Sequence, residues 1–148
     1  MKIKIRKLGN FDKELGLPEY KTPGSAGMDV KSCLDKPLVI RPGERVCVPT
    51  GLSFEFPEHM EMQVRPRSGL SLKSDLMVCN SPGTVDSDYR GELMVIIGNF
   101  GNRPYTIEHG TRIAQIVFCP VLRVELEDAQ DLSKTTREGG GFGSTGSK

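Results

Sequence analysis

Short apolar segments separated by turn residues run along most of this chain. Several of them alternate apolar and polar positions with a period of two, as at residues 2–6, 53–56 and 60–64, which predicts strands with one buried face. Further short apolar stretches lie at residues 38–40, 45–48, 76–79, 93–97, 105–107, 113–118 and 121–126. Many short strands separated by glycine and proline predict an all-β barrel or sandwich.

Helical periodicity is weak throughout the sequence. No window of helical length keeps its apolar residues at a period of 3.6. The best candidate is one or two turns over residues 68–73, which follow Pro66 and could begin with Ser68 as the N-terminal cap. The sequence shows no Rossmann unit and no internal repeat. We therefore expect one short helix in an otherwise all-β domain.

The C-terminal segment differs from the rest of the chain. Residues 133–148 are rich in glycine and have no apolar pattern beyond Phe142. Such a segment cannot bury enough surface to fold alone, so we predict a β domain over residues 1–132 and a flexible, glycine-rich arm over residues 133–148. Composition alone favours a frayed terminus, yet Arg137, the glycine N–H groups and the hydroxyls of the arm also suit an anion.

Composition narrows the class of protein. The 148 residues are enough for one domain with a real core, and a net charge of +1 argues against stable nucleic-acid binding or a membrane-surface role. No apolar run approaches the length that spans a bilayer, and the charged, alternating start is no secretory signal. His59 and His109 lack the spacing of a zinc site.

The four cysteines form no C-x-x-C pair. Cys47 and Cys79 fall within apolar runs, where cysteine behaves as a small hydrophobic residue. We expect all four cysteines to be reduced and structural, which fits a cytoplasmic protein.

Residues 80–92 form the polar stretch that is richest in candidate functional side chains. They lie between the apolar segments 76–79 and 93–97, which predict buried strands, so we expect this stretch on or near a hairpin turn. It contains two carboxylates and one tyrosine: Asp86, Asp88 and Tyr89. A rigid strand pair that presents a carboxylate and an aromatic ring suits a small-molecule site, although Asp, Gly and Ser are also the usual residues of a solvated turn.

Three other segments carry candidate chemistry. Asp29 lies between a glycine-containing turn and an extended segment. Arg67 and Ser68 stand at the expected helix start, where free N–H groups and a positive dipole end favour an anion. Gln115 is a lone amide in a buried strand. Each residue also has an ordinary interpretation: a turn cap, a helix cap or a partner for a neighbouring strand.

Five motifs, taken in order, carry a stronger signal. They read Ser-Ala-Gly-Met-Asp, Pro-Arg-Ser-Gly-Leu-Ser, Gly-Thr-Val-Asp-Ser-Asp-Tyr-Arg-Gly-Glu, Arg-Ile-Ala-Gln and Arg-Glu-Gly-Gly-Gly-Phe-Gly-Ser-Thr-Gly, and they span residues 25–146. In this order and spacing they resemble the trimeric dUTPase family, whose members hydrolyse dUTP to dUMP and pyrophosphate. Glu138 is a departure, because the family often has glycine there, and we expect its side chain to point outward.

The resemblance implies a distorted jelly-roll β-barrel that assembles as a homotrimer, with each of three active sites built from all three subunits. Its activity would limit uracil incorporation into DNA and supply dUMP for dTMP synthesis. Asp86 would orient and polarise the attacking water. One Mg²⁺ would be held mainly by the phosphates and by waters, with Asp29 in its outer shell through a water.

The resemblance also assigns the phosphate contacts. Arg67, Ser68 and the backbone of Gly69 would bind the β- and γ-phosphates, and Gln115 would help to hold the phosphate chain. In the arm, Phe142 would close over the uracil. The other arm residues expected to bind substrate are Arg137, Gly143, Ser144 and Thr145.

Selection of the nucleoside would depend on the expected hairpin. Uracil presents N3–H as a donor and O4 as an acceptor, and cytosine reverses both, so a fixed backbone complements only one of them. Tyr89 would pack beneath the deoxyribose and leave no room for a 2′-hydroxyl. The hairpin residues expected to line the nucleoside are Asn80, Gly83, Thr84, Val85 and Met94.

Two alternatives stay open. A dCTP deaminase relative would share the fold but need a different carboxylate arrangement and no matching arm, and it would release ammonia from dCTP. A trimer that senses nucleotide without turning it over would keep the pocket, although the presence of Asp86 argues against a catalytically dead site.

Overall fold

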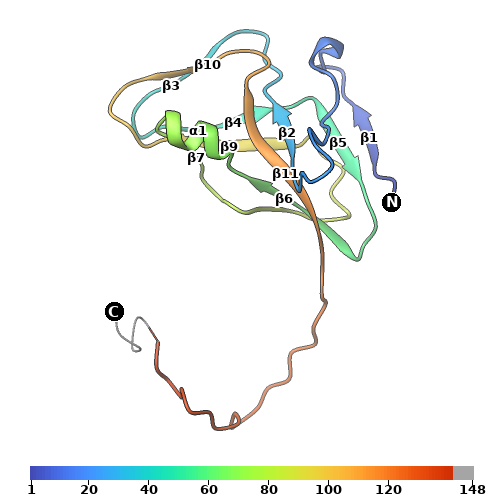
Figure 1. Cartoon of the computed structure of the whole chain (residues 1–148), viewed down its shortest axis with the longest axis vertical. Coiled ribbons are helices and arrows are strands. Elements are labelled where there is room, and N and C mark those ends of the chain that lie inside the picture. The colour runs from blue at the N-terminus through green and yellow to red at the C-terminus, as the bar shows by residue number, and fades with distance from the viewer. Residues whose placement is uncertain (142–148) are drawn as a thin grey trace.

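Strands dominate the computed structural model of the chain, which describes residues 1–141 (Figure 1). The expectation of a mostly β protein with one short α-helix is confirmed within these residues. In chain order the elements are β1 (Lys4–Lys7), the 3-10 helix η1 (Lys13–Leu15), β2 (Met28–Lys31), β3 (Leu38–Ile40), β4 (Arg45–Pro49), β5 (Leu52–Glu55), β6 (Met60–Arg65), α1 (Ser68–Lys73), β7 (Leu76–Val78), β8 (Gly83–Val85), β9 (Met94–Asn99), β10 (Tyr105–Ile107) and β11 (Arg112–Pro120).

The strands of residues 1–141 form four antiparallel sheets. The largest has the order β2-β11-β6-β8, and a three-stranded sheet has the order β4-β9-β7. Two pairs, β1-β5 and β10-β3, complete the fold. Over residues 1–141 these sheets do not join into one closed barrel.

The core lies between the inner faces of these sheets. Its fully buried members come from strands far apart in the sequence, among them Ile40, Val48, Ile97, Ile107 and Ile116. Each such side chain contributes about 1.5–3 kcal/mol by leaving water. The sheets are therefore fixed rigidly enough to hold polar side chains at their edges.

The prediction of a tight hairpin around residues 80–92 is wrong in one respect. β7 and β9 do pair, with Val78 opposite Ile97. The residues between them leave that sheet, however, and form β8, which pairs with β6 through Val64 opposite Gly83. Three residues are too few for a periodic pattern, so β8 has no recognisable sequence signature. The connection consequently bridges two sheets instead of turning back on one.

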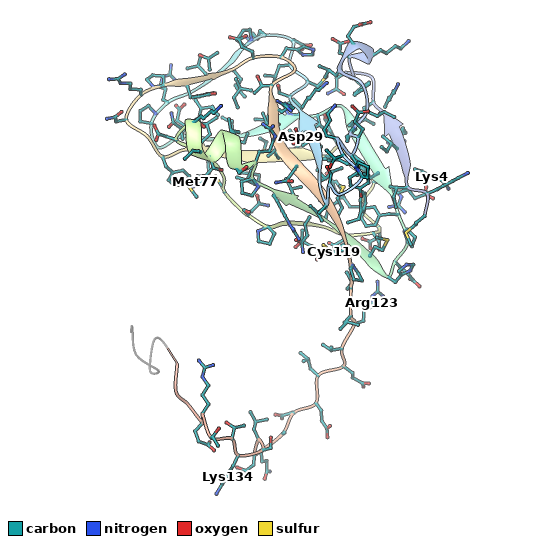
Figure 2. The ribbon with its side chains drawn as sticks, viewed as in Figure 1. Lys4, Asp29, Met77, Cys119, Arg123 and Lys134 are labelled. Atoms are coloured by element: carbon teal, nitrogen blue, oxygen red, sulfur yellow. The ribbon has the colours of Figure 1, made fainter. Side chains whose placement is uncertain are left out.

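The prediction of a strand over residues 121–126 is also wrong for the single chain. Val121 donates one backbone hydrogen bond to His59, at 2.9 Å, and the structure assigns no strand beyond Pro120 within the residues it describes. The alternating pattern is real, but its apolar side chains are exposed: Leu122 by 91%, Val124 by 77% and Leu126 by 91%. Figure 2 shows this segment, labelled at Arg123, leaving the folded body and continuing towards Lys134.

The short helix occupies the predicted residues, but its cap differs. α1 covers Ser68–Lys73, and the N-terminal cap is Arg67, whose side chain makes no capping hydrogen bond. Ser68 is therefore the first helical residue and not the cap. β2 was expected only as an extended segment after the glycine turn, and it pairs with β11.

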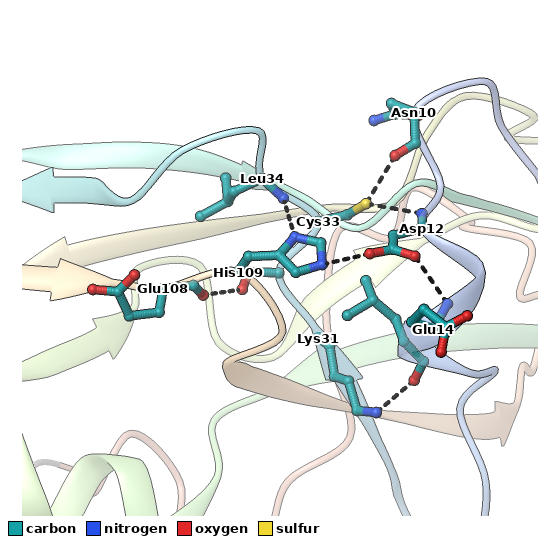
Figure 3. A network of polar contacts seen from close by, with 10 residues as sticks. Asn10, Asp12, Glu14, Lys31, Cys33, Leu34, Glu108 and His109 are labelled. Carbon is teal, nitrogen blue, oxygen red and sulfur yellow. Dashed lines mark hydrogen bonds and ion pairs between the residues drawn. The ribbon is translucent and has the colours of Figure 1, made fainter.

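A polar cluster ties the N-terminal loop to the rest of the fold (Figure 3). Leu34 donates its backbone N–H to Nδ1 of His109 at 3.1 Å, and Nε2 of His109 lies 3.0 Å from the Asp12 carboxylate. The thiol of Cys33 donates to the carbonyl of Asn10 at 2.9 Å. Both nitrogens of His109 have structural partners, which agrees with its interpretation as an ordinary loop residue.

All four cysteines are free thiols, but they differ in exposure. Cys33 is buried, whereas Cys47 and Cys79 are exposed. The apolar runs around Cys47 and Cys79 do not place these thiols in the core: Cys47 is exposed on β4, while its neighbour Val48 is fully buried. Among residues 1–141 no helix is long and apolar enough to cross a membrane.

Candidate active site

A cavity of about 260 Å³ lies where the connection between β7 and β9 crosses from one sheet to the other. Val64 of β6 and Ile96 of β9 contribute apolar wall, as does Leu93. Seven of the residues predicted to bind or process a nucleotide line this cavity: Asn80, Gly83, Thr84, Val85, Asp86, Tyr89 and Met94. A site of this size, largely apolar with a few convergent polar groups, is typical of small-molecule binding.

Asn80 and Gly83 form a close contact at one end of the cavity. Gly83 is buried, and a Cβ atom added to it would lie 2.9 Å from the Asn80 amide nitrogen. The lack of a side chain at position 83 thus lets the Asn80 amide pack against the β8 backbone. Pairing of β8 with β6 fixes this backbone, so the amide and the strand present a defined set of donors and acceptors.

The Tyr89 ring is held by its own loop. Its hydroxyl donates to the carbonyl of Glu92 at 3.0 Å. A Cβ atom at Gly91 would overlap the Tyr89 ring and hydroxyl, so only glycine leaves room for this packing. Glu92 in turn accepts from the backbone N–H of Gly51 at 2.7 Å and from the Asn10 amide at 3.0 Å. The tyrosine is therefore oriented by contacts that reach across to Gly51, just before β5, and to the N-terminal loop.

Asp86 stands on the wall between two cavities. It lines the main cavity and also a neighbouring one of about 320 Å³, whose lining includes Asp88, Glu58 and Glu61. Asp86 is exposed, and its carboxylate accepts no hydrogen bond from the residues that the structure describes. Asp88 lines only the second cavity. A free carboxylate at the edge of an apolar pocket is suited to accept a proton from water.

Asp29 lies in a second group of polar residues, at the edge of the four-stranded sheet. Its two carboxylate oxygens bind different arginines: Arg67 Nε donates to Oδ1 at 2.7 Å, and Arg112 Nη1 donates to Oδ2 at 3.2 Å. The Asp29 side chain is only 21% exposed. Figure 2 shows Asp29 within the folded body, near β2 and β11.

Gln115 belongs to this second group because β2 and β11 pair with Gln115 directly opposite Asp29. Its amide donates to the carbonyl of Pro66 at 2.8 Å. A side chain at Gly27 would collide with the Gln115 amide oxygen, so the absence of one leaves room for the amide. Gln115 thus connects the sheet to the segment that leads into α1.

Ser68 and Gly69 complete the second group. Both are exposed and form the first turn of α1, next to Arg67. The first N–H groups of a helix have no partner inside the helix, so these residues offer donors beside a guanidinium. None of the residues Asp29, Arg67, Ser68, Gly69 and Gln115 lines the main cavity.

The arm is described only as far as residue 141. Glu138 folds back onto Thr135: its carboxylate accepts from the Thr135 N–H at 2.8 Å, while its own N–H donates to the Thr135 hydroxyl at 3.0 Å. Arg137 Nε donates to the carbonyl of Gly140 at 2.7 Å. The exposed Glu138 is directed to Thr135 and, within the described part of the chain, makes no ion pair with Arg137. The predicted contacts of Phe142, Gly143, Ser144 and Thr145 lie outside the described residues.

Several residues that shape the main cavity and the second group were not predicted from the sequence. The motifs already quoted include Arg112, Gly91 and Glu92. The sequence did not show which residues these three contact. Cys47 gave no sequence signal, since it reaches the cavity only because β4 pairs with β9 beside Ile96. Within residues 1–141 no three His, Cys, Asp or Glu side chains are grouped so as to hold a metal by themselves.

Comparison with known proteins gives consistent matches over the whole chain. The model of the dUTPase family matches residues 13–146. The chain is 52% identical, over 148 residues and 100% of both chains, to the deoxyuridine 5′-triphosphate nucleotidohydrolase of Hydrogenobaculum sp. (strain Y04AAS1). It is 51% identical over 144 residues to the protein of the same name from Bdellovibrio bacteriovorus, covering 97% of this chain and 95% of the relative.

Solved structures agree with the fold. The dUTPase of Staphylococcus bacteriophage 80alpha with dUPNHPP has a TM-score of 0.88 at 26% identity, covering 98% of both chains. A mutant dUTPase from phage phi11 of S. aureus, described for its coordination of a structural Mg(II) ion, has a TM-score of 0.78 at 23% identity. That comparison covers 88% of this chain and 98% of the phage chain, and it shows a common fold.

Proposed function

The chain belongs to the dUTPase family, and we propose that it hydrolyses dUTP to dUMP and pyrophosphate in active sites completed by neighbouring copies of itself. One observation carries this proposal. The residues expected to bind the nucleoside, together with Asp86, line one cavity, while those expected to bind the triphosphate gather around Asp29 outside it. A nucleotide that needs both groups is served if they face each other across a subunit interface.

The exposed segment after β11 supports a homotrimer. Leu122, Val124 and Leu126 alternate with charged residues and lie in solvent in the single chain. β1 pairs only with β5 among the described strands, so its other edge is open. An apolar cavity of about 310 Å³ beside β1 is lined by residues that include Ile3, Ile5 and Phe118.

We infer that residues 121–126 of one subunit cover β1 of the next. Added strands of this kind would complete each subunit's sheets, which gives the distorted jelly-roll barrel that the single chain leaves open. A closed ring of three then follows from one repeated contact between different surfaces.

Asp86 is proposed as the base for attack of water on the α-phosphorus. The reaction requires a water in line with the leaving pyrophosphate, and a positioned carboxylate contributes typically 10²–10⁴-fold by taking its proton. The Asp86 carboxylate is available to accept this proton, because no described residue donates a hydrogen bond to it. Its position at the mouth of the apolar cavity places it beside whatever nucleoside the cavity holds.

The second group of residues, called here the Asp29 group, is compatible with a magnesium ion that would be held mostly by phosphates. Both oxygens of Asp29 already accept a charge-assisted hydrogen bond from an arginine, which argues against direct coordination. Each oxygen keeps a second lone pair, so Asp29 can accept a hydrogen bond from a metal-bound water. Mg²⁺ retains several waters in such sites and neutralises charge on the phosphates. Arg67, Ser68, the Gly69 backbone and Gln115 are the proposed phosphate contacts.

Base and sugar selection are proposed to follow from the rigid walls of the cavity. The Asn80 amide and the Thr84–Val85 backbone would pair with the uracil edge, and the wrong base would leave buried polar groups unpaired at about 1–3 kcal/mol each. Gly83 and Met94 complete the wall, which would leave no room for the methyl group of thymine. Tyr89, held by Glu92 and Gly91, would lie beneath the deoxyribose.

The arm is proposed to close over the bound nucleotide. Residues 133–148 would form this lid beside a catalytic domain of residues 1–132. Arg137, Gly143, Ser144 and Thr145 would meet the phosphates, and Phe142 would cover the uracil. We place the enzyme in the cytoplasm, where free thiols persist, and assign it the supply of dUMP and the removal of dUTP before DNA synthesis.

Substitution of Asp86 tests the proposed reaction. With dUTP and Mg²⁺, the wild-type chain should release pyrophosphate and dUMP, and Asp86→Asn should lose at least about 10³-fold in kcat while still binding nucleotide. Asp88→Asn is the matched control and should stay within about threefold of wild type, because Asp88 lines only the neighbouring cavity. Near-normal turnover by Asp86→Asn would show that another group is the base. Ammonia release from dCTP would instead favour the deaminase alternative.

A further inference from the structure

Arg112 is placed beside the proposed phosphate contacts by an irregularity in β11. The pairing of β11 with β2 shifts register between Arg112 and Ala114, as in a β-bulge. Bulges commonly redirect a side chain next to a functional site. Here both the side chain and the backbone carbonyl of Arg112 reach the pair formed by Asp29 and Arg67.

The three residues form a closed set of contacts. Arg67 uses Nε on Asp29 Oδ1, at 2.7 Å, and Nη1 on the carbonyl of Arg112, at 3.2 Å. Arg112 uses Nη1 on Asp29 Oδ2, at 3.2 Å. Each oxygen of Asp29 therefore serves one arginine, and Arg67 is fixed at two points.

This arrangement leaves Arg67 available for an anion. A guanidinium has five N–H donors, and the contacts above occupy one on Nε and one on Nη1 of Arg67. If Oδ2 of Asp29 were not occupied by Arg112, Arg67 could pair with both carboxylate oxygens, as arginine–carboxylate pairs often do. Such pairing would turn a further donor away from substrate and neutralise Arg67 more completely. With Arg112 present, two guanidiniums share one carboxylate and the group keeps one net positive charge.

We propose that Arg112 is a positioning residue for triphosphate binding, acting through Asp29 and its own carbonyl to hold Arg67 with free donors. This inference rests on the proposed function, in which Arg67 binds the β- and γ-phosphates. Its effect is specific to ligands that carry those phosphates. A nucleoside monophosphate lacks the β- and γ-phosphates that Arg67 is proposed to bind.

Binding of two ligands separates this role from a general structural one. The probes are dUMP and dUpNHpp, the dUTP analogue whose imido bridge resists cleavage between the α- and β-phosphates. Arg112→Gln should raise the Kd of dUpNHpp about tenfold, the scale of one charge-assisted hydrogen bond, and leave the Kd of dUMP within about twofold. Arg112→Lys should recover only part of the loss, because it restores the charge but not the planar fork. Arg103→Gln, an exposed arginine elsewhere, is the control and should change neither Kd.

A double-mutant cycle with Asp29→Asn identifies the route of the effect. If Arg112 acts through Asp29, Arg112→Gln should change the Kd of dUpNHpp less than about twofold once Asp29 is already Asn. The same tenfold loss in both backgrounds would show that Arg112 contacts phosphate itself and would overturn the proposal. The cycle is measured with Mg²⁺ and with EDTA. Coupling seen only with Mg²⁺ would also overturn it, because the metal and not Arg67 would then carry the effect.

The outcomes also separate this inference from the proposed function. A wild-type chain that binds neither dUpNHpp nor dUMP contradicts the proposed function, whereas a chain that binds both but shows no coupling contradicts only the role of Arg112. The Arg112 side chain is 51% exposed, so its variants are expected to fold. If Arg112→Gln fails to fold, Arg112→Lys carries the same cycle with a smaller expected effect.

Discussion

Gly91 lies directly against the ring of Tyr89, which is one of the residues that line the main cavity. Any side chain at position 91 overlaps the tyrosine ring and hydroxyl. Tyr89 is about half exposed, at 48%, so a ring displaced towards solvent would not disturb the core. A substitution here should therefore alter the cavity without unfolding the protein.

The expected result of Gly91→Ala is a loss of sugar discrimination. A displaced Tyr89 would no longer block the space of a 2′-hydroxyl, so the ratio of kcat/KM for dUTP over UTP should fall at least about tenfold, the scale of 1–3 kcal/mol for an imperfect pocket. Steady-state kinetics with both nucleotides measure this ratio. Gly24→Ala is the control, because a side chain there meets open space. An unchanged ratio in Gly91→Ala would remove Tyr89 from the sugar contact.

Single residues also show what the sequence could and could not reveal. The motif resemblance assigned Asn80, Asp86 and Tyr89 to one nucleoside site, and the structure brings them to one cavity. It did not reveal that Asp29 binds two arginines, because Arg112 lies at a register shift in the pairing of β11 with β2. A bulge depends on the register between two strands, which no local pattern specifies.

At the scale of elements, β8 is the strand that makes the connection between β7 and β9 part of the main cavity. Alternation of apolar residues predicted β6, and a continuous apolar stretch predicted β9, because each strand is long enough to show a pattern. β8 has only three residues, and its existence depends on pairing with β6. The predicted hairpin was therefore right about which strands pair, β7 and β9, and wrong about the path between them.

The arm is a second element with a separable role. Removal of residues 137–148 should lower turnover of dUTP by at least about 10²-fold, since a closing segment excludes water and completes the contacts to the phosphates. The molar mass from light scattering should stay that of the intact assembly, because the apolar residues of segment 121–126 are retained. A truncated protein with full activity would contradict the lid.

At the scale of the whole molecule, segment 121–126 links sequence pattern to assembly. The alternation there predicted a strand, but the single chain offers it no partner among the residues that the structure describes. Burial of a leucine or valine contributes about 1.5–3 kcal/mol each, so three such side chains in solvent represent a large unused driving force. This is why we assign the segment to a neighbouring subunit.

Charge in that segment should dissociate the proposed trimer. Leu122→Glu combined with Val124→Glu would place two carboxylates against the apolar cavity beside β1, and the molar mass should fall towards that of a monomer at micromolar concentration. Activity should fall in parallel, because the proposed shared sites would be incomplete in a monomer. The control is Leu132→Glu, which is equally exposed, at 88%, but lies beyond the alternating segment. A double variant that keeps its mass and activity would contradict the exchange of this segment.

The central claim is that each dUTP-hydrolysing site draws Asp86 from one subunit and Arg67 from another. Two inactive variants, Asp86→Asn and Arg67→Ala, are co-expressed with different tags, and mixed assemblies are isolated through both tags. The account predicts that pyrophosphate release from dUTP returns to about a third of the wild-type rate, since every mixed ring of three has one site that combines both intact residues. Mixed assemblies as inactive as either parent, alongside an active wild-type protein, would contradict it.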